Sequence, residues 1–180
     1  MPRTAGQNAQ IREHRRRQIL QAAVPLFARH GFSQTAIAEI AQAAGLSHGA
    51  VFLYYASKED LFHAAVLEPL AALEAAFSLD DQTGGAIADV LRRMVHDHVA
   101  VVSRQGSYLR LMQYVLGQRD RFPELAAPLF AFVDRFCARL LPLIRAGQAA
   151  GALAPGDPHS IAEAYLSYLG SDNQWNEKSG

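Results

Sequence analysis

The sequence predicts an all-α protein in which an N-terminal three-helix domain with a helix-turn-helix is followed by a larger helical bundle. Three observations predict this fold class. Apolar residues recur at spacings of three and four in one stretch after another. No stretch alternates between apolar and polar residues as a half-buried strand does. Half of the residues are hydrophobic and 19% are charged, a balance typical of a folded globular protein.

The composition argues against a membrane protein or a secreted one. No apolar run approaches the roughly 20 residues needed to cross a bilayer. The basic N-terminus is not followed by the apolar segment of a secretory signal. The single cysteine, Cys137, excludes an intramolecular disulfide. We therefore expect a cytoplasmic protein.

The first helix is expected from about Arg12 to His30. Residues 1–11 show no periodicity and are expected to form a mobile arm. Apolar positions then repeat at helical spacing, and Pro25 should bend or weaken the helix. Gly31 should end it, because glycine is the residue that most readily leaves helical geometry.

Residues 35–58 read as the helix-turn-helix. Thr35 precedes the second helix and can cap it, and its hydroxyl and the nearby N–H groups could receive a DNA phosphate. Gly45 lies where the turn needs a positive φ, and Ser47 can cap a third helix running from His48 to Tyr55. Such a motif presents its second helix to the DNA major groove.

Charge is uneven along the chain, although the formal net charge is zero. Up to Asp60, seven Lys and Arg residues stand against four acids, and after it ten stand against thirteen. This distribution is expected when only the front of the chain contacts phosphate. The run from Arg15 to Arg17 could either start a solvated helix or contact phosphate.

Helices continue to the C-terminal region. Ser57 should cap a long fourth helix that reaches Ser78, with a kink at Pro69, and residues 80–85 form the clearest break in the chain. Further helices are expected at about residues 86–104, 108–118, 123–150 and 159–169, with Gly106-Ser107 separating two of them and a kink at Pro142.

The N-terminal part resembles the DNA-binding domain of TetR-type transcriptional repressors over about residues 12–66. The residues that carry the resemblance are Ile19, Leu20, Ala23, Leu26, Phe27, Ala28, His30, Gly31, Phe32, Thr35, Ile37, Ala38, Ile40, Ala41, Ala44, Gly45, Leu46, Ser47, Gly49, Tyr54, Tyr55 and Ser57 to Phe62. The rest of the chain resembles the family only in architecture, including the turn from Gly151 to Pro158. The resemblance implies a DNA-binding domain at 1–57, with its arm, and an effector-binding and dimerisation domain at 58–180.

The resemblance also implies a set of DNA contacts. These residues are Thr35, Ser47, His48, Gly49, Ala50, Phe52, Leu53, Tyr54 and Lys58. The family often has a threonine at the position of Ala50 and a tyrosine at that of Phe52, so two phosphate hydrogen bonds are missing here. Both residues can still make apolar contacts, for example with a thymine methyl group.

The resemblance further implies a small-molecule site within the helical bundle and dimerisation through the last two helices. The expected effector is hydrophobic and neutral or weakly polar. The candidate lining residues are Phe77, Met94, His98, Tyr108, Met112, Phe132, Phe136 and Tyr165. One helix is evident after Pro158, and residues 171–180 are too short and polar for another core helix. Either the chain is truncated there, or it dimerises through a reduced surface. Trp175 could anchor a partner or belong to a disordered end.

No pattern indicates catalysis, a metal or a cofactor. The sequence has no strand followed by a glycine-rich loop and no HExxH or Cys/His metal spacing. His96 and His98 should point to different faces of one helix, because residues two apart do not face each other. With the helix-turn-helix, the resemblance implies a dimeric, ligand-responsive repressor on a palindromic operator. The alternatives are a helical small-molecule-binding protein or enzyme with a structural helix-turn-helix, or a nucleoid-type DNA binder without an effector.

Overall fold

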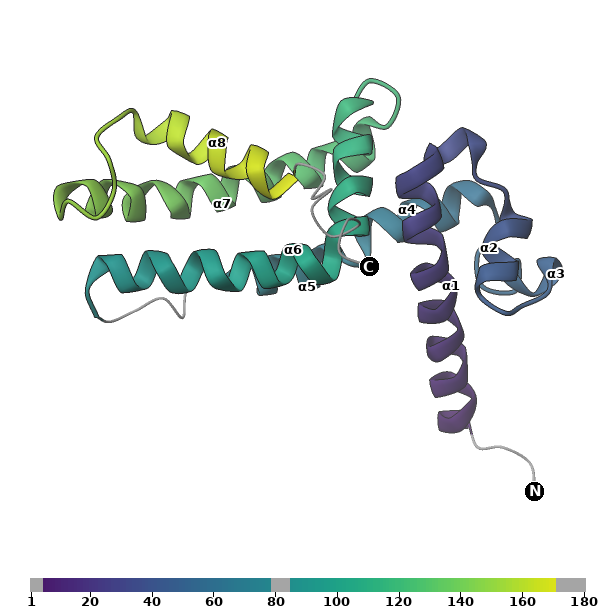
Figure 1. The fold of residues 1–180 in the computed structure, drawn as a ribbon. Helices are drawn as coiled ribbons and strands as arrows, with labels where there is room; N and C mark the ends of the chain where they lie inside the picture. The colour runs from purple at the N-terminus through teal and green to yellow at the C-terminus, as the bar shows by residue number, and fades with distance from the viewer. Residues whose placement is uncertain (1–4, 79–84, 171–180) are drawn as a thin grey trace, which may run out of the picture. The chain divides into compact units, whose positions relative to one another are not determined.

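The computed structural model describes residues 5–78 and 85–170, and every regular element within these ranges is an α-helix. The helices belong to two compact units, Met1–Pro69 and Leu70–Gly180 (Figure 1). The predicted all-α fold class, with an N-terminal helix-turn-helix and a helical C-terminal part, is confirmed. None of the helices in the described ranges combines the length and the apolar character that a membrane crossing needs.

The first helix, α1, runs from Ala5 to Gln34. The mobile arm expected up to residue 11 is therefore wrong for residues 5–11, and residues 1–4 lie outside the described residues. Alanine and glutamine dominate this stretch, and both favour helix. Gly31 leaves helical geometry with φ 70° and ψ 177°, so α1 breaks where its end was predicted, and a short helical segment continues to Gln34. The helix passes through Pro25.

Three more helices complete the first unit: α2 (Ile37–Ala43), α3 (His48–Val51) and α4 (Lys58–Leu67). Helix α1 packs against α2 and α4, and α2 packs against α3. An aromatic cluster joins α1 to α4, since the Phe62 ring centroid lies 5.0 Å from those of Phe27 and Phe32. This core holds α2 and α3 in place at its edge.

The third helix is shorter than predicted. Regular α-helix ends at Val51 rather than Tyr55, and the chain continues as a turn. The backbone tightens there, because Leu53 N donates to Ala50 O at 3.3 Å and Tyr54 N donates to Val51 O at 3.0 Å. These three-residue hydrogen bonds belong to a tighter winding than the α-helix.

The predicted long fourth helix is interrupted at the expected proline. Helix α4 ends at Leu67 and α5 covers Leu70–Ala76, with Pro69 between them. Proline supplies no backbone N–H and so disrupts the helical ladder. The two units also divide here, after Pro69, whereas the expected domain boundary followed residue 57. Helix α4 belongs with the first unit because its buried face packs against α1.

The second unit contains α5, α6 (Ile87–Gly117), α7 (Pro123–Ala149) and α8 (Pro158–Gly170). Helix α6 packs against α7, and α8 packs against both (Figure 1). The two helices expected at 86–104 and 108–118 are merged in α6. In place of the expected break between two helices, α6 changes direction at Gln105, which has φ −118° and ψ 19° (Figure 1).

Helix α7 extends through Pro142, and the kink expected there stays a prediction. Near its end, α7 approaches α6 closely at Gly147, where an added Cβ would lie 2.8 Å from Leu91 Cδ1. The break expected at residues 80–85 lies outside the described residues except for Gly85. Residues 171–180, including Trp175, also lie outside them.

Candidate nucleic-acid interface and ligand cavity

The turn between α2 and α3 has the predicted geometry. Gly45 adopts φ 63°, and the Ser47 hydroxyl accepts a hydrogen bond of 3.3 Å from Ala50 N as the N-cap of α3. The turn is fastened to α1, because Gln18 Nε2 donates to Ala44 O at 2.6 Å. Sequence reasoning missed this use of Gln18. The turn is thus fixed from inside the unit, which leaves α3 to face outward.

Helix α3 and the turn after it expose an apolar surface. Val51 is buried and anchors the segment, whereas His48 and Gly49 are exposed and Ala50 is half-buried. Beyond the helix, Phe52 is 42% exposed and Leu53 is 69% exposed. The His48 ring lies against Phe52 with centroids 5.2 Å apart. Large apolar side chains clustered on a surface are typical of a binding site.

Two arginines of α1 hold the turn that follows α3. The Arg12 guanidinium lies over the Tyr54 ring at 5.7 Å and donates to Leu53 O at 3.4 Å. Arg16 donates to Tyr54 O at 3.5 Å and lies over the Tyr55 ring at 4.8 Å. Arg16 was grouped with the possible phosphate contacts, but this holding role was not predicted. The signal available was the four-residue spacing that puts both arginines on one helix face.

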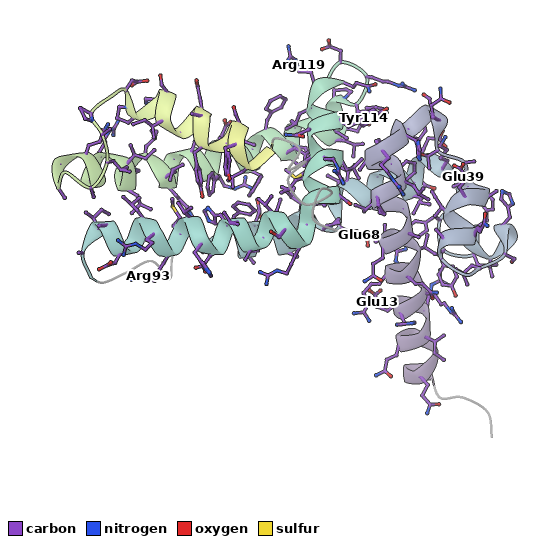
Figure 2. The ribbon with its side chains drawn as sticks, in the orientation of Figure 1. Glu13, Glu39, Glu68, Arg93, Tyr114 and Arg119 are labelled. Carbon is purple, nitrogen blue, oxygen red and sulfur yellow. The ribbon has the colours of Figure 1, made fainter. Side chains whose placement is uncertain are left out.

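Arg16 also forms an ion pair with Glu68. Glu68 lies at the end of α4 and is labelled in Figure 2. Tyr55, between them, is buried and its hydroxyl donates to Arg16 O at 3.5 Å. Burial, and then the nearby negative charge of Glu68, raise the pKa of Tyr55 to about 12. The Arg16 side chain thus connects the turn after α3 to Glu68, the last residue before Pro69.

Lys58 opens α4, where Ser57 is the N-cap as predicted. Its ammonium group lies 4.7 Å from the centre of the Phe32 ring and donates to Ser33 O at 3.3 Å. The side chain is partly exposed. The Lys58 ammonium group is thus held in a defined position at the start of α4.

Thr35 differs from its expected role. The N-cap of α2 is Ala36, whose backbone N–H donates to the Glu39 carboxylate at 3.1 Å. Thr35 itself is 1% exposed, and its hydroxyl donates to Gly31 O at 2.7 Å. The predicted cap is wrong, because the Thr35 hydroxyl donates inward to the carbonyl groups of α1 instead of accepting from an N–H of α2. An inward hydroxyl cannot receive a phosphate.

The second unit contains an apolar cavity of about 280 Å³. Its walls come from α6, α7, α8 and the residue directly after α5. Four predicted ligand residues line it: Phe77, Met112, Phe132 and Phe136. Further lining residues that were not predicted include Leu109, Leu116, Val133 and Leu166, with Gln113 and Ser167 as polar groups.

The other four predicted ligand residues, Met94, His98, Tyr108 and Tyr165, do not line this cavity. His98 is 2% exposed and shares a hydrogen bond of 2.6 Å between its Nδ1 and the Tyr165 hydroxyl. Its ring lies 4.6 Å from that of Phe77, so the pair stands behind the cavity wall. Burial lowers the pKa of His98 to about 4, and burial raises the pKa of Tyr165. His98 is therefore neutral near pH 7.

His96 is exposed, while His98 is buried, so the predicted separation of the two histidines onto different faces is confirmed. Across residues 5–78 and 85–170, no group of His, Cys, Asp and Glu side chains is arranged to hold a metal ion.

Comparison with known proteins covers both units. The family profile "Bacterial regulatory proteins, tetR family" matches residues 19–65. The profile "AefR-like transcriptional repressor, C-terminal domain" matches residues 89–178.

Individual relatives agree with the profiles. The chain is 30% identical to the HTH-type transcriptional regulator RutR of Escherichia coli K12 over 165 residues, which are 88% of this chain and 74% of RutR. The solved structure of the regulator PfmR from Thermus thermophilus is similar with a TM-score of 0.66 and 27% identity, over 84% of this chain and 81% of PfmR. AibR, solved in complex with isovaleryl coenzyme A and operator DNA, has the same fold with a TM-score of 0.71 and 22% identity, over 92% and 89% of the two chains.

Proposed function

Because the chain belongs to the TetR family of bacterial transcriptional regulators, we propose that it is a dimeric repressor that binds a palindromic operator and leaves it when a small effector binds. The observation that carries the proposal is the exposed apolar surface of α3 and the turn after it, which α1 holds from behind. A helix-turn-helix regulator needs such a rigid, outward-facing element to enter a major groove.

The proposed DNA contacts divide by chemistry. His48 offers a ring nitrogen to a base edge, while Ala50, Phe52 and Leu53 offer apolar contact to thymine methyl groups. Tyr54 and Lys58 lie toward the edge of this surface and are assigned to phosphates, which fix register rather than sequence. Ser47 and Gly49 complete the set by placing backbone close to the DNA. Thr35 is left out, because its hydroxyl is buried.

Dimerisation explains how a short helix can select one operator. Two copies would place their α3 elements in successive major grooves about 34–36 Å apart. An effector that favours another separation would lower operator affinity. A coupling free energy of about 1–3 kcal/mol suffices, since it changes affinity roughly 5- to 150-fold. The aromatic-walled cavity of the second unit supports such an effector.

The test is a titration of the chain with DNA flanking its own gene, at several salt concentrations. Lys58→Ala should weaken binding to every sequence and reduce the slope of log K against log salt by about 1. His48→Ala should instead change which sequences bind best. Arg93→Ala on α6 is the matched control for loss of one positive charge and should leave the slope unchanged.

An unaltered salt slope in Lys58→Ala would remove Lys58 from the interface. Absence of any salt-sensitive DNA binding by the unaltered chain would reject the proposed function and favour a helical binding protein or enzyme with a structural helix-turn-helix.

A further inference from the structure

A small polar cavity adjoins the apolar cavity of the second unit. It measures about 100 Å³, and its charged lining residues are Glu74 of α5 with Arg135 and Arg139 of α7. Phe77, Phe132 and Phe136 line both cavities. The two cavities thus share one aromatic wall, and an apolar space lies next to two guanidinium groups and one carboxylate.

Arg135 already binds a carboxylate at this wall. It forms an ion pair with Glu74, in which the arginine side chain is 59% exposed and the glutamate side chain 36% exposed. Exposed ion pairs contribute little net stability, because water and salt screen them. Another carboxylate can therefore replace that of Glu74 on Arg135 at low cost.

We propose that the effector is a small amphipathic carboxylate. Its apolar body fills the larger cavity, and its carboxylate takes the place of the Glu74 side chain on Arg135. Arginine binds carboxylates through paired, charge-assisted hydrogen bonds, and Arg139 adds a second positive charge at the same wall. The larger cavity, about 280 Å³, is at the small end for ligand pockets, which favours a short chain or a single ring system.

This inference rests on the proposed ligand-responsive function and gives its effector a chemical class. It replaces the neutral or weakly polar effector expected from the sequence, because spacing along the chain did not bring Glu74, Arg135 and Arg139 together. Binding of the carboxylate breaks the ion pair between Arg135 and Glu74. This ion pair joins α5 to α7, and α5 is the element that follows Pro69.

The test compares octanoate with 1-octanol, two probes with the same alkyl chain, by calorimetric titration of the full chain. Octanoate should bind more tightly than octanol. Arg135→Gln should weaken octanoate binding about tenfold, the worth of a charge-assisted hydrogen bond, and leave octanol binding unchanged. Glu74→Gln should strengthen octanoate binding, because it removes the competing carboxylate. Arg93→Gln on α6 is the control for charge alone, and melting curves check that each variant folds.

Equal affinity for the two probes, absence of octanoate binding, or octanoate binding that is indifferent to Arg135→Gln would overturn the inference. DNA binding is measured separately on the same samples. If the chain binds DNA but fails these comparisons, the carboxylate effector is rejected and the proposed repressor function stands. If the chain binds octanoate as described but binds no DNA, the carboxylate site stands and the proposed function is rejected.

Discussion

Leu53 shows how the candidate interface differs from the core at the scale of a single residue. It exposes 69% of its surface, while Val51, two positions earlier, is 1% exposed. Burying Leu53 would be favourable by about 1.5–3 kcal/mol, yet the isolated unit leaves it in water. A partner surface that covers Leu53 recovers that free energy, and we assign this role to DNA.

Leu53→Ser should therefore weaken operator binding several-fold and leave the free energy of unfolding within about 0.5 kcal/mol of the original chain, as exposed sites generally do. Fluorescence anisotropy measures the first effect and denaturant unfolding the second. Val95→Ser, at a residue of α6 that is 42% exposed, is the control and should change neither. A normal operator affinity in Leu53→Ser would show that this residue does not contact DNA.

His98 gives the second unit a dependence on pH. Its pKa is lowered to about 4 in the folded chain from an ordinary value of 6.5. Between these values the unfolded chain binds a proton that the folded chain excludes, so stability falls as pH drops from 6.5 toward 4. The loss should be on the order of 2 kcal/mol.

The difference in unfolding free energy between the original chain and His98→Leu should follow this pH window. Urea unfolding at pH 7, 6, 5 and 4 measures it, and the comparison cancels the contribution of the other histidines. A constant difference across the four pH values would contradict a neutral, buried His98.

Tyr165→Phe should lower the free energy of unfolding by about 1–3 kcal/mol at pH 7, because it leaves the His98 ring nitrogen unsatisfied.

At the scale of elements, Arg16 ties α1, the turn after α3 and the end of α4 into one body. Arg16→Ala should lower the affinity for operator DNA by changing the position of the turn, and it should lower stability by about 1 kcal/mol. Arg17→Ala removes the same charge one position away, where the side chain is 64% exposed, and is the control. Equal effects of the two changes on DNA affinity would indicate a general loss of charge rather than loss of positioning.

Sequence periodicity predicted the elements well where local signals were strong. The turn at Gly45, the cap at Ser47 and the interruption at Pro69 follow from the conformations that glycine, serine and proline favour. The inward hydroxyl of Thr35 could not be predicted, because it depends on where the Gly31 carbonyl points. Both acceptors of this hydroxyl, Gly31 O and Leu26 O, lie in the preceding helix, and their directions follow from the break in that helix at Gly31.

The lining of the cavity could be predicted only in part, because it depends on tertiary contacts. Helical spacing identifies the apolar face of each helix, and four of the eight candidates do line the cavity. Helical spacing does not show which part of that face lines a cavity and which part packs against another helix. His98 and Tyr165 pack against each other behind the wall, and Arg135 meets Glu74 across 61 positions of sequence.

For the whole molecule, the division after Pro69 separates the two candidate sites. The first unit carries the exposed α3 surface and the basic end of the chain, and the second carries the cavity. Glu68 and Glu74 lie on either side of Pro69, and each pairs with an arginine of its own unit. We expect effector binding at Arg135 to act through α5 on this junction.

The most direct measurement of operator recognition is a footprint of the chain on DNA flanking its own gene, with the stoichiometry determined on the same fragment. The account predicts two protected half-sites of inverted sequence, about one helical turn or a whole multiple of it apart, bound by two chains or a multiple of two. His48→Ala should change which half-site sequence is bound best, because the base contact of the His48 ring is lost. Protection without a symmetric site, or equal affinity of the original chain for unrelated DNA, would contradict the account.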